Sequence, residues 1–462
     1  MLQNIILVTA LNLNKINIVK KSIFIKDKIN NFKNRLINVD GDKSLSIRFI
    51  IFSSLAKGKS SAKNLLMSED VISAINCIKK LGIKVQISKS KCNVFGKGLG
   101  GYRYKKNLLL DAGNSGTTAR LLSATLIDTK NTITITGDNS LRKRDMLRII
   151  KPLSKMGVKL KSKNGKLPLT IFKSNKINPI KYFENLGSAQ CKSAVMIAGL
   201  KTPGKTFLKC VPSRNHTELM FKNVLKIPVK IKNIKNFDQI QIDGLKEFNS
   251  FNYKIPGDIS SAAFFIVLTL LSEDSSLKIK QVNINSSRIG IIKIFNMMGA
   301  NIKFTNQSIY KGEPVADIFV RSNNKLNSIN LNPKLNSSAI DEFLLIFLVA
   351  AFSNGVSTFK KLGELNKKES KRLDWGYKIL KMIGIKVKKI KNHGIKIYGN
   401  PNFIIKKKIV IKDFLKDHRV FMVSVITALT KGGEWKIYDP DSIKTSFPNF
   451  LDIIAKLGGK IN

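Results

Sequence analysis

The pattern that sets the architecture of this chain first occurs at Leu81-Gly82-Ile83-Lys84-Val85. The end of an apolar helix meets a glycine, and a strand that alternates basic and aliphatic residues follows. The glycine supplies the left-handed backbone of a helix C-terminus, and the alternation is typical of a half-buried strand. The pattern returns, once in a degenerate form, at Met156–Leu160, Leu225–Ile231, Met298–Ile302, Ile383–Val387 and Leu457–Ile461. Successive copies lie about 70 to 85 residues apart, which predicts six α/β units of similar size.

A second pattern, of longer period, divides the six units into two halves. Gly41-Asp42-Lys43-Ser44 resembles Gly257-Asp258-Ile259-Ser260, about three units further on, and each copy precedes an apolar run. Asp and Ser directly before such a run are helix N-cap residues. We therefore predict two similar domains of three units each, linked by two hinge crossings, with a ligand cleft between them. The predicted boundaries are a basic N-terminal extension over 1–34, a first domain over 41–255, and a second domain over 35–40 plus 256–462.

Length and composition are those of a globular protein with an unusual charge. The 462 residues exceed one ordinary core, and 43% of them are hydrophobic. No apolar run is long enough to cross a bilayer, so no membrane partner is expected. The net charge of +51 makes a basic nucleic-acid-binding protein one alternative. However, the lysines are spread along the chain together with many Ile and Asn residues, and no aromatic–basic module is visible in the sequence. We therefore expect no specific nucleic-acid partner.

The cysteines give no sign of a metal or disulfide framework. Cys77, Cys92, Cys191 and Cys210 form no CxxC pair, and the chain has only three histidines. We expect no metal, and a reducing, cytoplasmic location.

Several polar segments are suited to binding anions. Lys43 and Arg48 flank small hydroxyl residues at a helix start, and helix N-termini favour anions. Asp111–Arg120 is a glycine-rich turn that leads into a helix, without the ending of a P-loop or the glycine spacing of a dinucleotide site. Taken singly, each segment is equally well read as a capped surface helix or a plain turn. Further segments of this kind are Gly137–Arg144, Gly187–Ala194, Ser213–Glu218, Ile340–Glu342, Glu364–Arg372 and Asp417–Arg419.

Taken together and in this order, these segments resemble the 5-enolpyruvylshikimate-3-phosphate synthase family from about Val39 to the C-terminus. The most specific motifs of this resemblance are Gly41–Ser46, Ser188–Ala194, Pro256–Phe264, Lys368–Ser370, Asp417–Arg419 and Ser446–Pro448. The resemblance implies an α/β fold of the enolpyruvyl transferase type, an inverse α/β barrel with helices inside and sheets outside. It also implies transfer of the enolpyruvyl group of phosphoenolpyruvate to the 5-hydroxyl of shikimate 3-phosphate, by a monomer without cofactors.

The resemblance assigns roles to individual residues. It implies catalytic roles for Asp341 as proton acceptor, Glu369 as proton donor, and Lys43. The residues implied for shikimate 3-phosphate are Lys43, Ser44, Arg48, Ser188, Ala189, Gln190, Arg214, Asp341 and Lys368. Those implied for phosphoenolpyruvate are Lys43, Gly116, Arg144, Gln190, Arg372 and Arg419. Arginine suits this task because its planar group binds phosphate and carboxylate oxygens in pairs.

Departures from the family pattern include Asn215 in place of Asp and Asn366 in place of Arg, which puts local geometry in question more than reaction type. The nearest alternative is the related transferase that acts on a UDP-amino sugar. That family uses a loop cysteine, and here no cysteine lies between Cys92 and Cys191.

Overall fold

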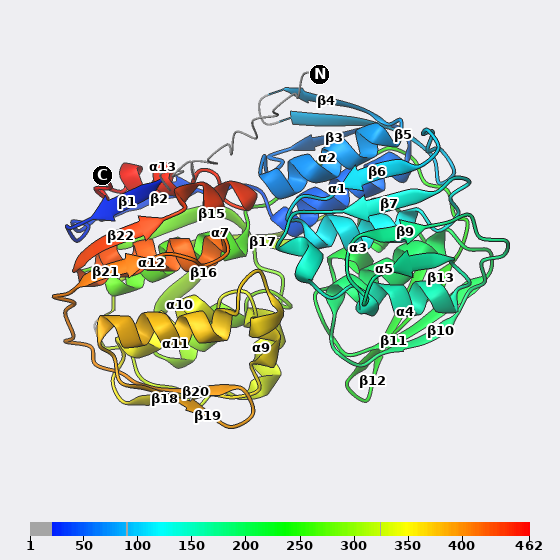
Figure 1. Cartoon of the computed structure of the whole chain (residues 1–462). Helices are drawn as coiled ribbons and strands as arrows, with labels where there is room; N and C mark the ends of the chain where they lie inside the picture. The colour runs from blue at the N-terminus through cyan, green and yellow to red at the C-terminus, as the bar shows by residue number, and fades with distance from the viewer. Residues whose placement is uncertain (1–20, 89–90, 324) are drawn as a thin grey trace, which may run out of the picture.

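The computed structural model of the chain describes residues 21–88, 91–323 and 325–462, and it has two lobes (Figure 1). Helices lie inside each lobe and sheets lie outside. The described strands form six separate open sheets, and none of these sheets closes into a barrel. The architecture is thus the mixed α/β arrangement that the repeats predict.

The first lobe contains three four-stranded sheets of the same design. In each of them the first two strands are parallel, and the remaining neighbours are antiparallel. In spatial order, the first sheet consists of β14 (Asn252–Lys254), β3 (Lys57–Lys63), β5 (Lys91–Lys97) and β4 (Lys84–Ser88). The second consists of β6 (Leu108–Asp111), β7 (Ile133–Thr136), β9 (Leu169–Ile171) and β8 (Leu160–Ser162). The third consists of β10 (Lys181–Glu184), β11 (Lys205–Cys210), β13 (Phe237–Asp243) and β12 (Val229–Ile234).

The second lobe contains the other three sheets. The fourth sheet consists of β16 (Asn301–Tyr310), β17 (Glu313–Arg321), β15 (Ser276–Asn283) and β2 (Arg35–Asn38). The fifth consists of β18 (Val356–Phe359), β20 (Gly394–Tyr398) and β19 (Val387–Ile390). The sixth consists of β1 (Ser22–Ile25), β22 (Glu434–Tyr438) and β21 (Lys408–Ile411).

Strand β1 corrects the predicted N-terminal extension. It pairs antiparallel with β22 in the sixth sheet, and the Phe24 N–H donates to the carbonyl of Asn462 at 2.7 Å. Phe32 is also buried in the second core. The predicted extension over 1–34 is therefore wrong for residues 22–34, which belong to the fold, and its residues 1–20 lie outside the described residues. A chain end that pairs with a distant strand has no local sequence signal, which explains the error.

The core of each lobe is built on three helices that are buried on nearly every side. These are α1 (Lys43–Leu55), α3 (Gly116–Thr125) and α5 (Ala189–Leu200) in the first lobe, and α7 (Ile259–Leu271), α10 (Phe343–Ala351) and α12 (His418–Lys431) in the second. Small and apolar residues make up most of their faces, and the few charged side chains on them, such as Arg48 and Arg120, are themselves buried. The remaining longer helices are α2 (Glu69–Lys80), α4 (Leu147–Lys155), α8 (Gly290–Met297), α11 (Arg372–Ile383) and α13 (Phe450–Lys456). Short helical turns complete the set: η1 (Leu141–Lys143), α6 (His216–Leu219), η2 (Met220–Val224), η3 (Pro333–Leu335), α9 (Asn336–Ala339), η4 (Gly363–Lys367) and η5 (Pro440–Thr445).

The glycines of the repeated pattern take the conformation that the sequence predicts. Their φ angles are all positive, between 82° and 101°, at Gly82, Gly157, Gly299, Gly384 and Gly458. Strands β4, β8, β16 and β19 follow the first four of these glycines, and β12 follows the degenerate copy. The helix–glycine–strand prediction is therefore confirmed for the first four of these glycines. It is wrong for the sixth copy, because no strand follows Gly458 among the described residues.

Two separate hydrophobic cores meet where the chain crosses between the lobes. One core takes its members from Leu45–Ile255, and the other from Ile23–Val39 and Ile259–Leu457. The crossings lie side by side, because Gly41 bridges Gly257 and the Asp258 N–H donates to the carbonyl of Asp40 at 2.9 Å. We propose 41–255 as the first domain, and 21–40 with 256–462 as the second.

No helix in the described part of the chain is both long enough and apolar enough to span a membrane.

Candidate active site

The predicted site residues lie at the N-terminal ends of the helices and face the seam between the two domains. Lys43, Gly116 and Ala189 open α1, α3 and α5, while Arg372 opens α11 and Arg419 lies in the first turn of α12. Side-chain caps hold these helix starts, since Asp42, Ser115, Ser188 and Asp417 each accept a backbone N–H three or two residues on. The partial positive charge of a helix N-terminus adds to the basic side chains there.

Asp341 lies at the centre of this seam, in the turn before α10. Arg214 of the first domain binds its carboxylate, Lys368 Nζ lies 3.0 Å from Oδ1, and Arg372 Nη1 lies 3.6 Å from the same oxygen. Arg419 Nη1 donates to the Asp341 carbonyl at 2.6 Å. Burial by itself raises the pKa of Asp341, but Arg214, Lys368, Arg419 and Arg372 outweigh it and hold the pKa well below 3.8. The carboxylate is therefore ionised and surrounded by cations from both domains.

Glu369 is the second carboxylate at the seam. It binds Arg372, and its Oε1 lies 3.5 Å from Arg144 Nη1 of the first domain. Burial raises the pKa of Glu369, but Arg372 and Arg144 outweigh it and hold the pKa well below 4.5. Asn114 Oδ1 accepts a hydrogen bond from Arg144 Nη2 at 2.6 Å and orients that guanidinium. The structure thus brings together Arg144, Glu369, Asp341 and Arg419, as the sequence predicts.

Asp417 is a site residue that the sequence reasoning missed. It binds Arg372 with both oxygens, at 2.9 Å to Nε and 3.1 Å to Nη2, and it also accepts from Ser370 Oγ at 2.8 Å. Burial lowers the pKa of Arg372, but Asp417 and Glu369 outweigh it and raise the pKa above its usual value. The Asp417–Arg419 motif is visible in the sequence, but an N-cap carboxylate does not reveal which distant arginine it binds.

In the first domain, Arg48 is bound by neutral atoms. It donates to Thr217 Oγ1 and Ser193 Oγ at 2.9 Å each, and to the Ser44 carbonyl at 3.1 Å. Burial lowers its pKa to about 10. All three acceptors belong to the first domain. These hydrogen bonds of Arg48 therefore join helices of that domain and do not cross to the second domain. Nearby, Lys43 Nζ lies 3.0 Å from Asp70.

Arg120 is a second residue that the sequence reasoning missed. Its Nη1 donates to Gln190 Oε1 at 2.6 Å, its Nη2 donates to the Asp145 carbonyl at 2.8 Å, and burial lowers its pKa to about 9. The guanidinium lies over Gly116, where a Cβ atom would come within 2.6 Å of Nη1. The signal was present in the sequence, because Gly116 and Arg120 are one helical turn apart.

A buried polar network ties the domains together beside the two crossings. Arg288 of the second domain binds Asp42 at 3.0 Å and Asp258 at 3.2 Å, which are the N-caps of α1 and α7. Next to it, His216 Nδ1 of the first domain lies 2.6 Å from Glu313 Oε1 of the second. None of these three contacts was predicted, since the partners are at least 30 residues apart in the chain.

Two departures from the family pattern have defined partners. Asn215 Oδ1 accepts from Asn285 Nδ2 at 2.9 Å across the domains. Asn366 Oδ1 accepts from the Leu373 N–H at 3.0 Å and so caps the start of α11, which carries Arg372. Both amides are therefore integrated into the site's supporting bonds.

The four cysteines are buried and unpaired. Burial raises the pKa of Cys77, Cys191 and Cys210 to about 12 and that of Cys92 to about 11, so their thiols stay protonated and unreactive at neutral pH. Among the described residues, no group of three or more metal-type side chains is placed to hold a metal ion.

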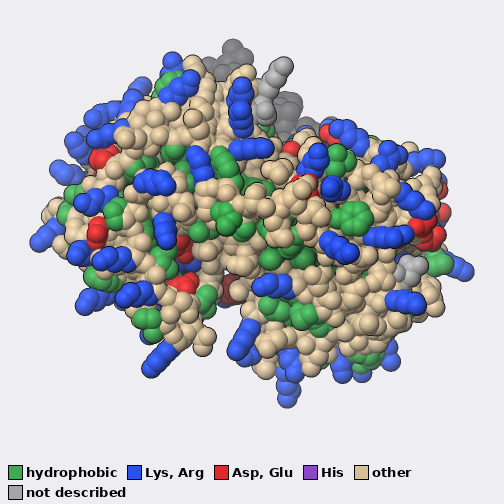
Figure 2. All heavy atoms as spheres, turned by 180° about the vertical axis from the view of Figure 1, so that it is seen from behind, with side chains coloured by type: hydrophobic (Ala, Val, Ile, Leu, Met, Phe, Trp, Pro, Cys, Tyr) green, Lys and Arg blue, Asp and Glu red, His purple; other side chains and the backbone are tan. Residues whose placement is uncertain are grey.

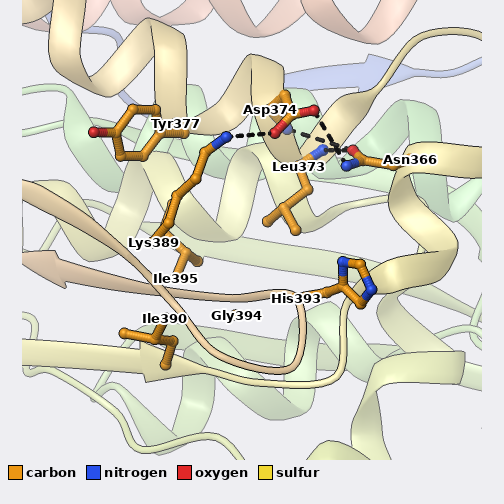
Figure 3. A pocket seen from close by; sticks show the side chains of 9 residues that line it. All are labelled: Asn366, Leu373, Asp374, Tyr377, Lys389, Ile390, His393, Gly394 and Ile395. Atoms are coloured by element: carbon orange, nitrogen blue, oxygen red, sulfur yellow. Dashed lines mark hydrogen bonds and ion pairs between the residues drawn. The ribbon is translucent and has the colours of Figure 1, made fainter.

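A cavity of about 200 Å³ lies elsewhere, within the second domain between α11 and the β19–β20 hairpin (Figure 3). Figure 3 shows Lys389 reaching Asp374, at 2.8 Å, with Asn366 on the other side of that carboxylate. None of the predicted site residues lines it. Its principal charged groups neutralise each other, and it takes no part in the site at the seam.

Comparisons with known proteins agree with this geometry. The enolpyruvyl transferase NikO from Streptomyces tendae has the same fold, with a TM-score of 0.75 at 12% identity over 96% of this chain and 98% of that chain. EPSP synthase from Acinetobacter baumannii matches with a TM-score of 0.83 at 32% identity, over 96% of this chain and 99% of that one. The fold is therefore that of the enolpyruvyl transferases.

Sequence relatives narrow the class to one family. The profile of EPSP synthase (3-phosphoshikimate 1-carboxyvinyltransferase) matches residues 27–454. The 3-phosphoshikimate 1-carboxyvinyltransferase of Ruthia magnifica is 38% identical over 92% of this chain and 96% of the relative. That of Thermoanaerobacter sp. strain X514 is 39% identical over 94% and 97%. The chain belongs to the EPSP synthase family of transferases.

Proposed function

We propose that this protein transfers the enolpyruvyl group of phosphoenolpyruvate to the 5-hydroxyl of shikimate 3-phosphate and releases inorganic phosphate. The observation that carries the proposal is the position of Asp341, which is only 15% exposed and is contacted by Arg214 from one domain and Lys368 from the other. Membership of the EPSP synthase family supports the same reaction.

Two anionic substrates fit the distribution of charge along the seam. Lys43, Arg48 and Arg214 would hold the phosphate and carboxylate of shikimate 3-phosphate, together with Ser44, Ser188, Ala189, Gln190 and Lys368. Arg144, Arg372 and Arg419 would hold phosphoenolpyruvate beside Lys43, Gly116 and Gln190. Arginine forks and helix N-termini bind such oxygens without any change of charge state.

The carboxylates move the protons. Asp341 takes the proton of the 5-hydroxyl as that oxygen attacks C2 of phosphoenolpyruvate, while Glu369 delivers a proton to C3. In the addition intermediate that results, C2 carries both the new ether oxygen and the phosphate. Loss of the C3 proton back to Glu369 and departure of phosphate restore the double bond and give the enol ether. The surrounding cations stabilise the phosphate as it leaves.

Binding of the substrates itself sets the basicity of the two carboxylates. Without substrate, Arg214, Arg372 and Arg144 bind Asp341 and Glu369 and hold both pKa values low. Substrate phosphate and carboxylate groups compete for the same guanidinium groups. Once these cations turn to the substrates, the pKa values of Asp341 and Glu369 rise, so that proton transfer is favoured only in the loaded site.

The test is phosphate release by the purified protein with both substrates, and with each substrate omitted in turn. We expect release only when both are present, and a product heavier than shikimate 3-phosphate by one enolpyruvyl group. Replacing shikimate 3-phosphate by UDP-N-acetylglucosamine, with phosphoenolpyruvate still present, should give no phosphate release. Turnover of the UDP-sugar but not of shikimate 3-phosphate would contradict the proposal. Arg144→Ala should abolish most turnover, and Arg321→Ala, an exposed arginine at the end of β17, serves as the matched control.

A deuterium experiment tests the role of Glu369 as proton donor independently of the role of Asp341. In D₂O, the reversible protonation of C3 should place deuterium in the methylene group of the product. Glu369→Gln should slow this incorporation together with turnover. Unchanged deuterium incorporation in Glu369→Gln would remove Glu369 from the role of proton donor.

A further inference from the structure

The outer face of the third sheet combines basic and aromatic side chains that are separate in the sequence. Residues that pair across neighbouring strands point to the same side of a sheet. Lys181 pairs with Phe207 and Phe183 with Lys209, while Gln241 and Gln239 of β13 connect these pairs to Lys230 and Lys232 of β12. We call these four lysines and two phenylalanines the lysine–phenylalanine face. The sheet lies at the outside of the first domain (Figure 1).

The two phenylalanines do not belong to the core of the domain. Phe183 is 51% exposed and Phe207 is 39% exposed, whereas Leu208, Ile240 and Ile242 on the inner side of the same sheet are buried. Phe237 of β13 packs edge-on against Phe183, with ring centroids 5.5 Å apart. The rings thus form a partly exposed apolar surface. Exposing this surface to water costs free energy, and no other element of the domain covers it.

Lysine amines lie directly over these rings. Lys209 Nζ lies 5.4 Å from the centroid of Phe183 and 4.7 Å from that of Phe237, and Lys181 Nζ lies 6.0 Å from that of Phe207. Lys205 adds a further cation, and Asp243, which pairs with it, is the one carboxylate among the paired positions of this side. Positive charge and ring surface therefore occupy the same face.

We propose that the lysine–phenylalanine face binds single-stranded nucleic acid with little regard to sequence. Aromatic rings on an open sheet offer stacking surfaces to unpaired bases once the lysine amines that lie over them turn to the phosphates, which they neutralise. Duplex DNA fits less well, because its bases are already stacked and paired. Lys and Arg side chains are spread over the face of the molecule shown in Figure 2, and the net charge of +51 adds a long-range attraction for such a polyanion.

The first sheet supplies a matched control within the same molecule. It has the same arrangement of strands, and its outer side carries one ring, Phe95, with the lysines Lys57, Lys59, Lys63, Lys84, Lys91 and Lys97. Both faces are therefore rich in lysine, but they differ in their aromatic content. Any polyanion that responds to charge alone would bind both faces equally.

The experiment measures fluorescence anisotropy of a labelled oligothymidylate of about 20 nucleotides, titrated with full-length protein at several salt concentrations. Phe183→Ser with Phe207→Ser should weaken binding about ten-fold and leave the salt dependence unchanged, because stacking is lost but no phosphate contact. Lys181→Ser, Lys209→Ser and Lys232→Ser together should lower the salt slope by about 2. The control triple Lys59→Ser, Lys63→Ser and Lys91→Ser should change affinity by less than about two-fold.

Folding and partner class are checked in the same series. All variants should keep full turnover, because the lysine–phenylalanine face lies outside the seam. Phe183→Tyr with Phe207→Tyr should retain oligonucleotide binding, because the rings remain.

Equal weakening of oligonucleotide binding by the two lysine triples, or no effect of the paired serine variant, would overturn the proposal. So would equal affinity for a duplex of the same length. Vesicles with anionic headgroups form a second arm; a loss of vesicle binding alone in the paired serine variant would identify a lipid surface and also overturn it.

Discussion

The two halves of the seam hold their buried cations in different ways. In the first domain, Arg48 and Arg120 are bound by hydroxyl, amide and carbonyl oxygens, and burial lowers their pKa values to about 10 and about 9. In the second domain, Arg372 is bound by the carboxylates of Asp417 and Glu369, which raise its pKa. Arg48 and Arg120 therefore have no carboxylate partner, whereas Arg372 and the first-domain residues Arg214 and Arg144 are bound by carboxylates of the second domain.

This difference suggests an order of events. A phosphate or carboxylate that approaches Arg48 or Arg120 displaces no carboxylate and gains free energy at once. An anion that binds Arg214, Arg144 or Arg372 must first displace Asp341 or Glu369, which offsets part of the gain. Because we propose Arg48 as a contact of shikimate 3-phosphate, we expect this substrate to bind before phosphoenolpyruvate. The following predictions test or refine this comparison.

The largest effect is expected for Asp341→Asn, the centre of the second half. Turnover should fall by about 10²- to 10⁴-fold, because the acceptor of the hydroxyl proton is lost while the shape of the side chain is kept. Phosphate release measures it, with Glu434→Gln, an exposed carboxylate on β22, as the control. Turnover close to that of the unchanged protein would rule out Asp341 as the base.

The next largest effect is expected for Asp417→Asn, which leaves Arg372 without its main carboxylate. Breaking a buried ion pair costs about 3–5 kcal/mol, so the free energy of unfolding should fall by that amount and KM for phosphoenolpyruvate should rise. Urea denaturation measures the first and steady-state kinetics the second. The control is Asp374→Asn, on the same helix as Arg372. It breaks the exposed ion pair between Asp374 and Lys389 of β19 and should cost less than about 1 kcal/mol. A similar cost for both variants would show that Asp417 does not anchor Arg372.

A pH effect should distinguish the carboxylate-rich half. The folded-state pKa of Glu369 lies well below 4.5, so its contribution to stability is present above the unfolded pKa and is lost as pH falls through the folded pKa. The unchanged protein should therefore lose stability steadily below about pH 4.5. Glu369→Gln should flatten this slope by up to about 1.4 kcal/mol per pH unit, measured by urea denaturation between about pH 3 and 6. An unchanged slope would mean that the carboxylate is not held ionised by Arg372 and Arg144.

The smallest effect is expected in the first half, for Gly116→Ala. A Cβ there would lie 2.6 Å from Arg120 Nη1 and must push the guanidinium away from Gln190. Overpacking of this kind costs about 1–3 kcal/mol, so KM for phosphoenolpyruvate should rise about ten-fold with a smaller change in kcat. Gly100→Ala is the control, because nothing lies within 4 Å of a Cβ at that position. Equal kinetics in the two variants would show that Arg120 and Gln190 do not shape the phosphoenolpyruvate site.

Much of the fold was predictable because its signals are local. Gly82, Gly157 and Gly384 mark helix ends through a backbone conformation that most residues avoid, and the alternation after each of them identifies the strand. The residues proposed for the site came from the family resemblance, which itself rests on short motifs, several of them at helix starts. By contrast, β1 was missed, because a strand that pairs with β22 across more than 400 residues has no nearby partner to reveal it.

Partnerships between distant side chains were equally hidden. The sequence places Arg372 and Asp417 in separate motifs, and only packing of α11 beside the start of α12 joins them through both carboxylate oxygens. Nothing in the motifs indicates that Arg288 binds the N-caps of both crossings. Such pairs depend on the relative position of whole helices, which no local pattern encodes.

The amino-acid sequence was enough to define six α/β units, two halves, and a family whose motifs carry cations and carboxylates at helix N-termini, because each of these features depends on residues within one turn or one strand. The tertiary structure alone decided which cation faces which carboxylate, and that Phe183 and Phe207 share a face with Lys209. The physical reason is that electrostatic pairing and exposure depend on distance in space, and sheet pairing and domain contact bring together residues that the chain keeps far apart.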